Sequence, residues 1–206
     1  MSVTAAEAIE LSGTTPDGQS KSGLFATSRG TGDAGDLIID TGQLTVREQA
    51  QASVSNLGTG SAGNLQVQAD SIRLDEGKLA AETASGRGGN ISLQAQDLLL
   101  LRNQSQISTT AGTVGAGGNG GNIEIDADFL IGLGNSDITA NSFEGEGGFI
   151  QITATEGVFG LERRDILTGD SDITAFSQRA PALSGEIAIN NPDVDPTQGL
   201  VELPAE

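Results

Sequence analysis

The sequence contains no cysteine, histidine, tyrosine or tryptophan, and these absences exclude several kinds of chemistry. Without cysteine, the chain has neither a disulfide scaffold nor a catalytic thiol. Without histidine, it lacks the most frequent general acid and base, and without tyrosine and tryptophan it lacks rings that commonly stack on sugars. We therefore expect a protein that is not an enzyme and that has no organic cofactor.

Positive charge is scarce as well. Ten Lys and Arg stand against 28 Asp and Glu, which gives a formal net charge of −18. Phosphate contacts need cations, so nucleic acid and anionic lipid are excluded as partners. No apolar run approaches the ~20 residues of a membrane span, and residues 1–11 lack the order of a signal peptide. We expect no nucleic-acid partner, no membrane span and no signal peptide in this chain.

The main feature that is present is a repeat, in which glycine and one further residue precede an apolar, polar, apolar run. Its six copies are GDLII (35–39), GNLQV (63–67), GNISL (89–93), GNIEI (121–125), GFIQI (148–152) and GEIAI (185–189). The first glycines of successive copies lie 28, 26, 32, 27 and 37 residues apart. Repeats of this period are typical of proteins in which each unit buries its apolar face against its neighbours.

Two further short runs follow the first one in most units. The second runs are QLTV (43–46), SIRL (71–74), DLLL (97–100) and FLIG (129–132). The third runs are ASVS (52–55), LAAE (79–82), ISTT (107–110), ITAN (138–141) and ITAF (173–176). Clusters of Gly, Asn, Asp and Ser separate these runs, which indicates three strands in one turn of the chain.

Alternation within the first run predicts which side chains point inward. The inward columns are Leu37, Leu65, Ile91, Ile123, Ile150 and Ile187, and then Ile39, Val67, Leu93, Ile125, Ile152 and Ile189. The pattern predicts an all-β fold, a parallel β-helix of about six coils with three short strands per coil. An α/β sheet would need crossover helices for which these glycine-rich gaps are too short, and the signature of leucine-rich repeats is absent.

The pattern also divides the chain. Residues 1–34 read as a partial N-terminal coil, because Ala8–Leu11 resembles a second run and Gly23–Ser28 a third, while no first run is recognised. Residues 35–190 carry the repeats, and residues 191–206 form an acidic tail that contains prolines. A stack that begins within a coil presents an unpaired strand edge. We therefore expect the upstream coils of a longer exoprotein as a partner.

The glycine and asparagine motifs are predicted to shape turns and not to bind ligands. The string G-x-G-x-x-G occurs at 30–35, 58–63 and 115–120, but each copy precedes a strand and no helix follows, so we expect turns with positive φ rather than a dinucleotide site. Asp36, Asn64, Asn90 and Asn122 occupy one position in successive coils. We expect these side chains to hydrogen-bond the backbone of neighbouring turns.

Three features remain as candidate sites. Alternating carboxylates could bind Ca²⁺, which would be the only cofactor, and the candidate ligands are Asp170, Asp172, Asp193 and Asp195. The pleat predicts an outward apolar patch, which is either covered by a loop or the tail or serves as a contact patch. Its residues are Leu99, Leu101, Phe129 and Ile131. The insertion 161–170 is a further expected contact region.

Two other functions find less support in the sequence. A carbohydrate-active β-helix enzyme, of polysaccharide lyase or hydrolase type, needs clustered carboxylates on one outward face. Outward Asp40, Glu82, Glu124 and Asp126 do not align on adjacent coils. Ice binding needs a flat threonine ladder, and only Thr139 and Thr174 contribute to the corresponding column. A degraded remnant without independent function is another alternative.

The coils GGN-I-x-I-x-A (120–127), the DITA runs at 137 and 172, and the ending NPDVDPTQGLVELP (191–204) resemble the C-terminal part of filamentous haemagglutinin-like exoproteins of cyanobacteria. The resemblance covers nearly the whole chain. It implies a right-handed parallel β-helix exported by two-partner secretion through an outer-membrane pore. It also implies an extracellular or cell-surface location, an adhesin-like stalk or spacer, an unidentified glycan or protein partner, and no catalytic residues.

Overall fold

The computed structural model describes residues 1–18 and 20–192. Strands of the first sheet are β1 (Ser2–Ser12), β3 (Leu37–Arg47), β5 (Leu65–Asp75), β7 (Ile91–Arg102), β9 (Ile123–Leu133), β11 (Phe149–Phe159) and β14 (Glu186–Asn190). Strands of the second sheet are β2 (Gly23–Phe25), β4 (Gln51–Ser53), β6 (Lys78–Ala80), β8 (Gln106–Ser108), β10 (Asp137–Thr139), β12 (Glu162–Arg163) and β13 (Asp172–Thr174). The 3₁₀ helix η1 spans Pro181–Leu183.

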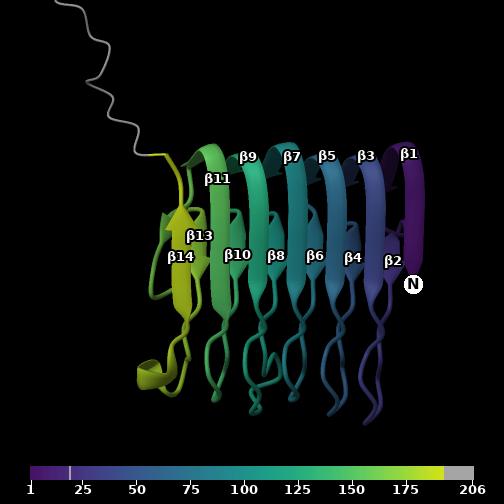
Figure 1. The fold of residues 1–206 in the computed structure, drawn as a ribbon. Helices are drawn as coiled ribbons and strands as arrows, with labels where there is room; N and C mark the ends of the chain where they lie inside the picture. The colour runs from purple at the N-terminus through teal and green to yellow at the C-terminus, as the bar shows by residue number, and fades with distance from the viewer. Residues whose placement is uncertain (19, 193–206) are drawn as a thin grey trace, which may run out of the picture.

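The strands stack into a parallel β-helix, which confirms the predicted fold class (Figure 1). The first sheet has the order β1-β3-β5-β7-β9-β11-β14 and the second the order β12-β13-β10-β8-β6-β4-β2. All the pairings between these strands are parallel. Each coil therefore binds its neighbour by backbone hydrogen bonds on both sheets.

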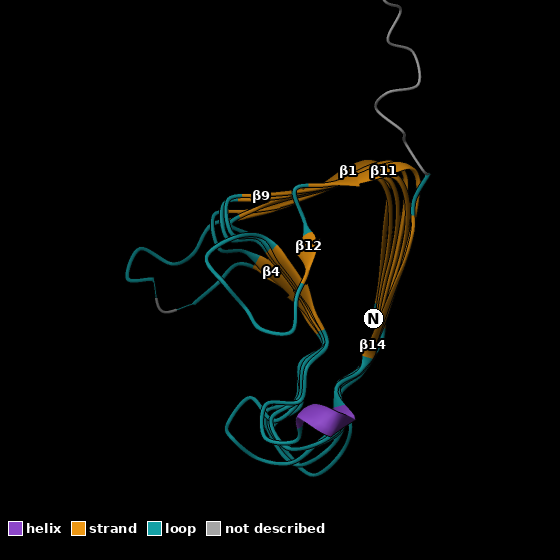
Figure 2. Ribbon diagram, turned by 90° about the vertical axis from the view of Figure 1, so that its left-hand side faces the viewer, coloured by secondary structure: helices purple, strands orange, loops and turns teal. Residues whose placement is uncertain are grey.

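Each coil has three faces, but the first two of its three predicted strands are joined into one long strand. The first and second runs form one strand of 11 or 12 residues that bends at a corner, and the third run forms the short strand (Figure 2). Pairing shifts at this corner, for example between Ala95 and Leu98. Such irregularities bend a strand without ending it. We call these surfaces the first, second and third faces.

The predicted register of the first face is confirmed. Leu37 pairs with Leu65, which pairs with Ile91, and the column continues through Ile123 and Ile150. These five side chains are at most 1% exposed. Because the inward residues of the three faces meet in one core, every coil buries apolar surface mainly against the coils above and below it.

From the second repeat onward, the glycine that begins the repeat is required by close stacking and not by positive φ. A Cβ built on Gly89, Gly121 or Gly148 would lie 1.8, 1.8 or 1.9 Å from the carbonyl oxygen of the glycine one coil earlier. Of the glycines in the three G-x-G-x-x-G strings, only Gly115 and Gly118 have positive φ. The expectation of turns holds, but its reason is corrected: the backbones of successive coils approach too closely for any side chain.

Positive φ occurs instead at the corner between the second and third faces. There the left-handed residues include Glu76, Asn103, Gln104 and Asn135, together with Gly134. A buried serine follows in three successive coils, and each hydroxyl accepts the N–H of a residue one coil earlier, Gly77 to Ser105, Ser105 to Ser136 and Ser136 to Ser171. This ladder satisfies backbone groups that the turn would otherwise leave buried and unpaired.

The two ends of the stack differ. In the first coil Ser2–Ala5 pairs with Ile38–Thr41, so this coil does have a first run, which its sequence hides because the glycine pattern is missing. The other end is covered on the second sheet by β12, which comes from the insertion after β11 and pairs with β13. Leu161 packs on the core beside it.

Candidate functional site

The third face carries the main concave surface of the molecule. Two grooves of about 430 and 660 Å³ lie on it, and both are lined by Glu82 and Thr113, so they join into one trough along the axis of the solenoid. Loops project at the two corners of this face (Figure 2), and residues of these loops line both grooves. Leu167, from the insertion predicted as a contact region, lines one groove, and Lys21 lines the other. We call this surface the third-face trough.

The floor of the trough is made by the outward residues of the short strands. Register places Ser53, Ala80, Ser108 and Thr139 in one column, directly opposite each other on β4, β6, β8 and β10. All four are 7% exposed or less, although they point away from the core. Small side chains in every coil, with larger ones on both sides, produce a hollow that runs across the strands.

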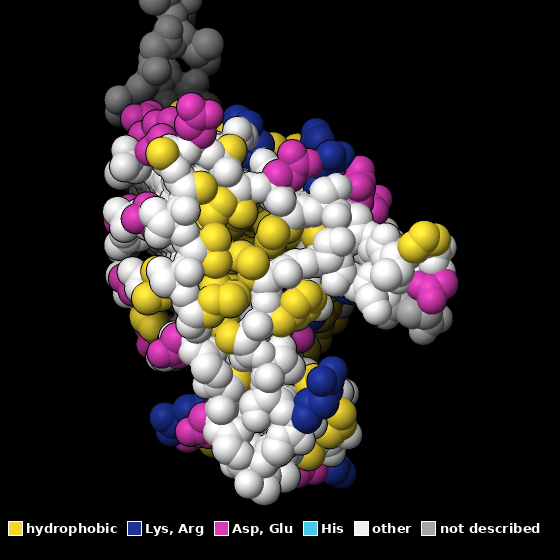
Figure 3. Space-filling view, turned by 90° about the vertical axis from the view of Figure 1, so that its right-hand side faces the viewer, with side chains coloured by type: hydrophobic (Ala, Val, Ile, Leu, Met, Phe, Trp, Pro, Cys, Tyr) yellow, Lys and Arg dark blue, Asp and Glu magenta, His cyan; other side chains and the backbone are white. Residues whose placement is uncertain are grey.

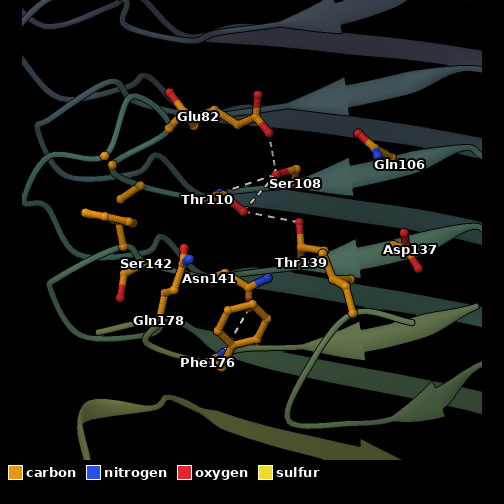
Figure 4. Close-up of a pocket in the computed structure, with 16 residues that line it drawn as sticks. Glu82, Gln106, Ser108, Thr110, Asp137, Thr139, Asn141, Ser142, Phe176 and Gln178 are labelled. Atoms are coloured by element: carbon orange, nitrogen blue, oxygen red, sulfur yellow. Dashed lines mark hydrogen bonds between the residues drawn. The ribbon is translucent and has the colours of Figure 1, made fainter. Parts of the chain in front are cut away.

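A chain of polar groups crosses this floor (Figure 4). Ser108 donates to Glu82 at 2.6 Å, and the hydroxyl of Thr110 lies 3.1 Å from Ser108 and 3.3 Å from Thr139. Lys78 donates to both carboxylate oxygens of Glu82, at 3.0 and 2.9 Å. Glu82 is therefore neutralised and held in one orientation, and the hydroxyls next to it are ordered.

Asp137 is the acidic residue of the trough that forms no ion pair with Lys or Arg among the described residues. It is 8% exposed, and its Oδ1 accepts the N–H of Asp172 at 3.0 Å. Burial raises the pKa of Asp137, and the nearby charge of Asp172 adds to the rise. Because Asp137 lines the trough, a ligand hydroxyl can donate a hydrogen bond to its carboxylate.

The calcium candidates have other partners where they are described. Asp172 is fully buried, and Arg164 Nε lies 2.9 Å from its Oδ1, close enough for an ion pair although the N–H is not aimed at the oxygen. Asp172 also accepts hydrogen bonds from Thr168. Asp170 is exposed and lies 3.4 Å from Arg164. Asp193 and Asp195 lie outside the described residues. Within 1–18 and 20–192, no group of three or more acidic residues is placed to hold a metal ion.

Aromatic rings stand at the sides of the trough. Phe176 lines the groove near Thr139 and Asn141, and Phe25 lines the other groove and is 43% exposed. Phe143 also borders the trough, but the guanidinium of Arg179 lies over its ring at 5.6 Å. Phe25 and Phe176 therefore offer apolar surface toward the trough from different coils.

Half of the predicted apolar patch is wrong. Leu99 and Leu101 are fully buried, because β7 has one residue more than its neighbours and the extra residue reverses the inward and outward positions after Ala95. Phe129 is 40% exposed and Ile131 is partly exposed, as predicted. On the second face, Phe129 lies 6.4 Å from Phe159, centroid to centroid.

The interpretation of the asparagine column as structural is confirmed. Asp36 Oδ1 accepts the N–H of Asn64 at 2.7 Å, and Asn90 Oδ1 accepts the N–H of Asn122 at 3.1 Å. The column ends where Asn122 Oδ1 accepts the N–H of Phe149. These side chains continue the hydrogen bonding of the first sheet past the strand ends and form no ligand array.

The N-terminal end of the stack is an open apolar surface. Figure 3 shows hydrophobic side chains gathered in the centre of this end and surrounded by polar groups. Val3, Ile9, Leu11 and Leu24 are only partly buried here, whereas the residues that pair with Val3 and Ile9, Ile39 and Leu44, are fully buried. The outer edge of β1 carries no neighbouring strand in the sheet order of the described residues.

The trough was not predicted from the sequence. The signal that could have found it is the column of small residues at the second position of the third runs, which by itself looks like an incomplete threonine ladder. Of the four outward carboxylates weighed for catalysis, Glu82 lines the trough, whereas Glu124 and Asp126 point outward from the first face.

Comparison with known proteins identified no matching family model, no similar curated protein and no similar solved structure. The fold and the surfaces described above therefore carry the functional argument. Among the described residues, no helix has the length and apolar character needed to cross a membrane.

Proposed function

We propose that this chain is a non-enzymatic segment of an extracellular or cell-surface β-helical protein of the filamentous haemagglutinin type, acting as a rigid stalk or adhesive spacer. The observation that carries the proposal is the unbroken parallel stacking of seven strands in each of two sheets. Each coil contacts its neighbours through backbone ladders and a shared apolar core. Such a stack resists bending and separates its two ends by a fixed distance.

The open N-terminal end supports the upstream coils of a longer exoprotein as a partner. A further coil stacked on β1 and β2 would pair the free edge of β1 and cover Val3, Ile9 and Leu11, in the way that β3 is covered by β5. Natural proteins rarely leave such an edge exposed, because it pairs with other chains. By the resemblance, the same longer protein is exported through an outer-membrane secretion pore.

A coil addition tests this partner directly. A copy of residues 65–90 joined to Met1 keeps the register, since Ser2 pairs with Ile38 and Ile38 with Gln66. We expect a higher Tm and less self-association than in the original chain, because the added coil covers the open end. A lower Tm with an intact β-type circular dichroism spectrum would show that the N-terminal end does not accept a coil.

Cell-surface display tests the function itself. The chain, extended by the added coil and anchored on a bacterial cell, should mediate adherence to cells or glycan-coated surfaces without consuming a soluble substrate. The enzyme alternative predicts cleavage of a polysaccharide that is lost in Glu82→Gln or Asp137→Asn. Cleavage of that kind, or a folded chain whose display leaves adherence unchanged, would contradict the proposal.

A further inference from the structure

We propose that the third-face trough binds a neutral, linear polysaccharide, laid along the axis of the solenoid with one sugar ring for each coil. This inference rests on the proposed adhesive function and names the ligand class that the trough would take. Three observations support it: the direction and repeat of the trough, the kinds of side chain that line it, and its charge.

The direction and repeat of the trough favour a polymer of sugar rings. Its floor column Ser53, Ala80, Ser108 and Thr139 crosses successive strands, which are spaced at about 4.8 Å in a sheet. This rise is close to the length of one ring in an extended polysaccharide. An extended peptide advances about 3.3 Å per residue, so its side chains would fall out of step with the coils.

The lining also fits a sugar chain. A sugar ring presents hydroxyl groups at its edge and C–H groups on its faces, so it needs hydrogen-bonding partners together with an apolar surface. The trough offers the hydroxyls of Ser108 and Thr110, the amides of Gln106 and Gln178, and the carboxylate of Asp137 (Figure 4). The ring of Phe176 lies beside these groups, and Phe25 lies toward the other end of the trough.

Charge favours a neutral ligand. Glu82 is paired with Lys78 and Asp172 with Arg164, so these two carboxylates are compensated within the chain, while Lys21 and Arg29 line the other groove. A net charge of −18 repels anionic glycans and anionic polymers generally. The carboxylate open to a cationic ligand would be mainly that of Asp137, and burial raises the pKa of this group, which disfavours its charged form. Hydrogen bonding and stacking therefore carry the recognition.

The test is binding of neutral oligosaccharides of increasing length to the purified chain, measured by isothermal titration calorimetry. Probes are soluble oligomers derived from cellulose, mannan, xylan and chitin. For one of these series we expect affinity to rise with length until the trough is filled, and to change little between low and high salt. Thr110→Arg, which places a long side chain at a partly exposed position that lines the groove, should weaken binding by about tenfold or more.

Two further variants keep the test interpretable. Phe176→Ala removes the ring without filling the groove and should also weaken binding, and Gln66→Arg places the same new side chain on the outward side of the first face and should leave it unchanged. Circular dichroism melts confirm that each variant is folded. If Thr110→Arg does not fold, Phe176→Ala decides the outcome.

Absence of binding to all four series overturns the proposal, and so does binding that Thr110→Arg and Phe176→Ala leave intact. Salt-sensitive binding of oligolysine that the same variants abolish would also overturn it, because the trough would then recognise cations. Adherence of displayed cells that persists in Thr110→Arg and in excess oligosaccharide would leave the proposed function standing while this inference fails.

Discussion

The first and third faces of this solenoid share one core but present different outer surfaces. On the first face, the outward side chains are mostly long and polar, as in Gln66, Glu124 and Gln151, and most lie in solvent. On the third face, the corresponding positions carry small residues such as Ala80 and Ser108, which lie at the bottom of a trough. Regular stacking fixes where each column lies, and side-chain size along a column decides whether the face is flat or concave.

The largest effect is expected where the two faces are alike, in the core. Ile125→Asp on the first face and Ile138→Asp on the third should each unfold the stack, because both side chains are at most 1% exposed and an unpaired buried charge costs several kcal/mol. Gln151→Ala, which points outward, should be nearly neutral. Thermal melts followed by circular dichroism measure this, and equal Tm values for Ile125→Asp and Gln151→Ala would refute the register.

The second-largest effect is expected on the second face, where the extra residue in β7 turns Leu99 inward. Leu99→Ala should destabilise the chain by about 2–5 kcal/mol, because Leu99 is fully buried and its truncation leaves a cavity. Leu100→Ala, one position along the same strand, should cost less than about 1 kcal/mol because Leu100 points outward. Urea unfolding curves compare the two free energies of unfolding. The reverse order would restore the register predicted from sequence spacing.

A smaller effect is expected at the edge of the first face, where backbones of successive coils touch. Gly121→Ala places a Cβ 1.8 Å from the carbonyl oxygen of Gly89 and should cost about 1–3 kcal/mol, since one coil must shift. Gly117→Ala is a matched control in the preceding loop, because nothing lies within 4 Å of its Cβ. Similar Tm values for the two variants would contradict the close-stacking role of the glycine column.

The smallest effect belongs to the third face. Asp137 has a raised pKa, so its ionised form is disfavoured in the folded state, and its contribution to stability falls as pH rises from below its unfolded pKa of 3.8 through its folded pKa. Asp137→Asn keeps an oxygen for the N–H of Asp172 and removes the charge. We expect a small rise in Tm at pH 7 that shrinks toward pH 3. A Tm difference that grows as the pH falls would contradict this assignment.

Much of the fold could be predicted because the repeat constrains many coils at once. Apolar alternation in Leu65-Gln66-Val67 recurs in six units, so the inward columns of the first face and the alignment of Ala52, Leu79, Ile107 and Ile138 on the third were predicted correctly. Prediction was wrong at a unit that departs from the repeat. Inserting one residue in β7 exchanged the two sides of a strand, because side chains alternate with a period of two.

The candidate site was less predictable than the fold. Asp137 looked like an ordinary polar residue of a DITA run, and Asp172 was predicted as a candidate calcium ligand. In the structure Asp172 is buried beside Arg164 and Thr168, which come from the insertion 161–170. Likewise, the small residues of the third runs gave no sign of a trough, since a trough needs walls. Those walls come from the corner loops that follow the floor strands, such as 111–115, and from Leu167 of the insertion 161–170.

By itself, the sequence determined that this protein is a stack of parallel coils, because glycine and alternating apolar residues recur at a period that lets each coil bury its apolar face against the next. It also determined the acidic surface and the absence of thiol, imidazole and indole groups. Only the tertiary structure decided that the repeated glycines serve close backbone contact, that Leu99 faces inward and that the third face is hollow. These properties depend on distances between neighbouring coils and on loops folded over a face, which one coil's sequence does not contain.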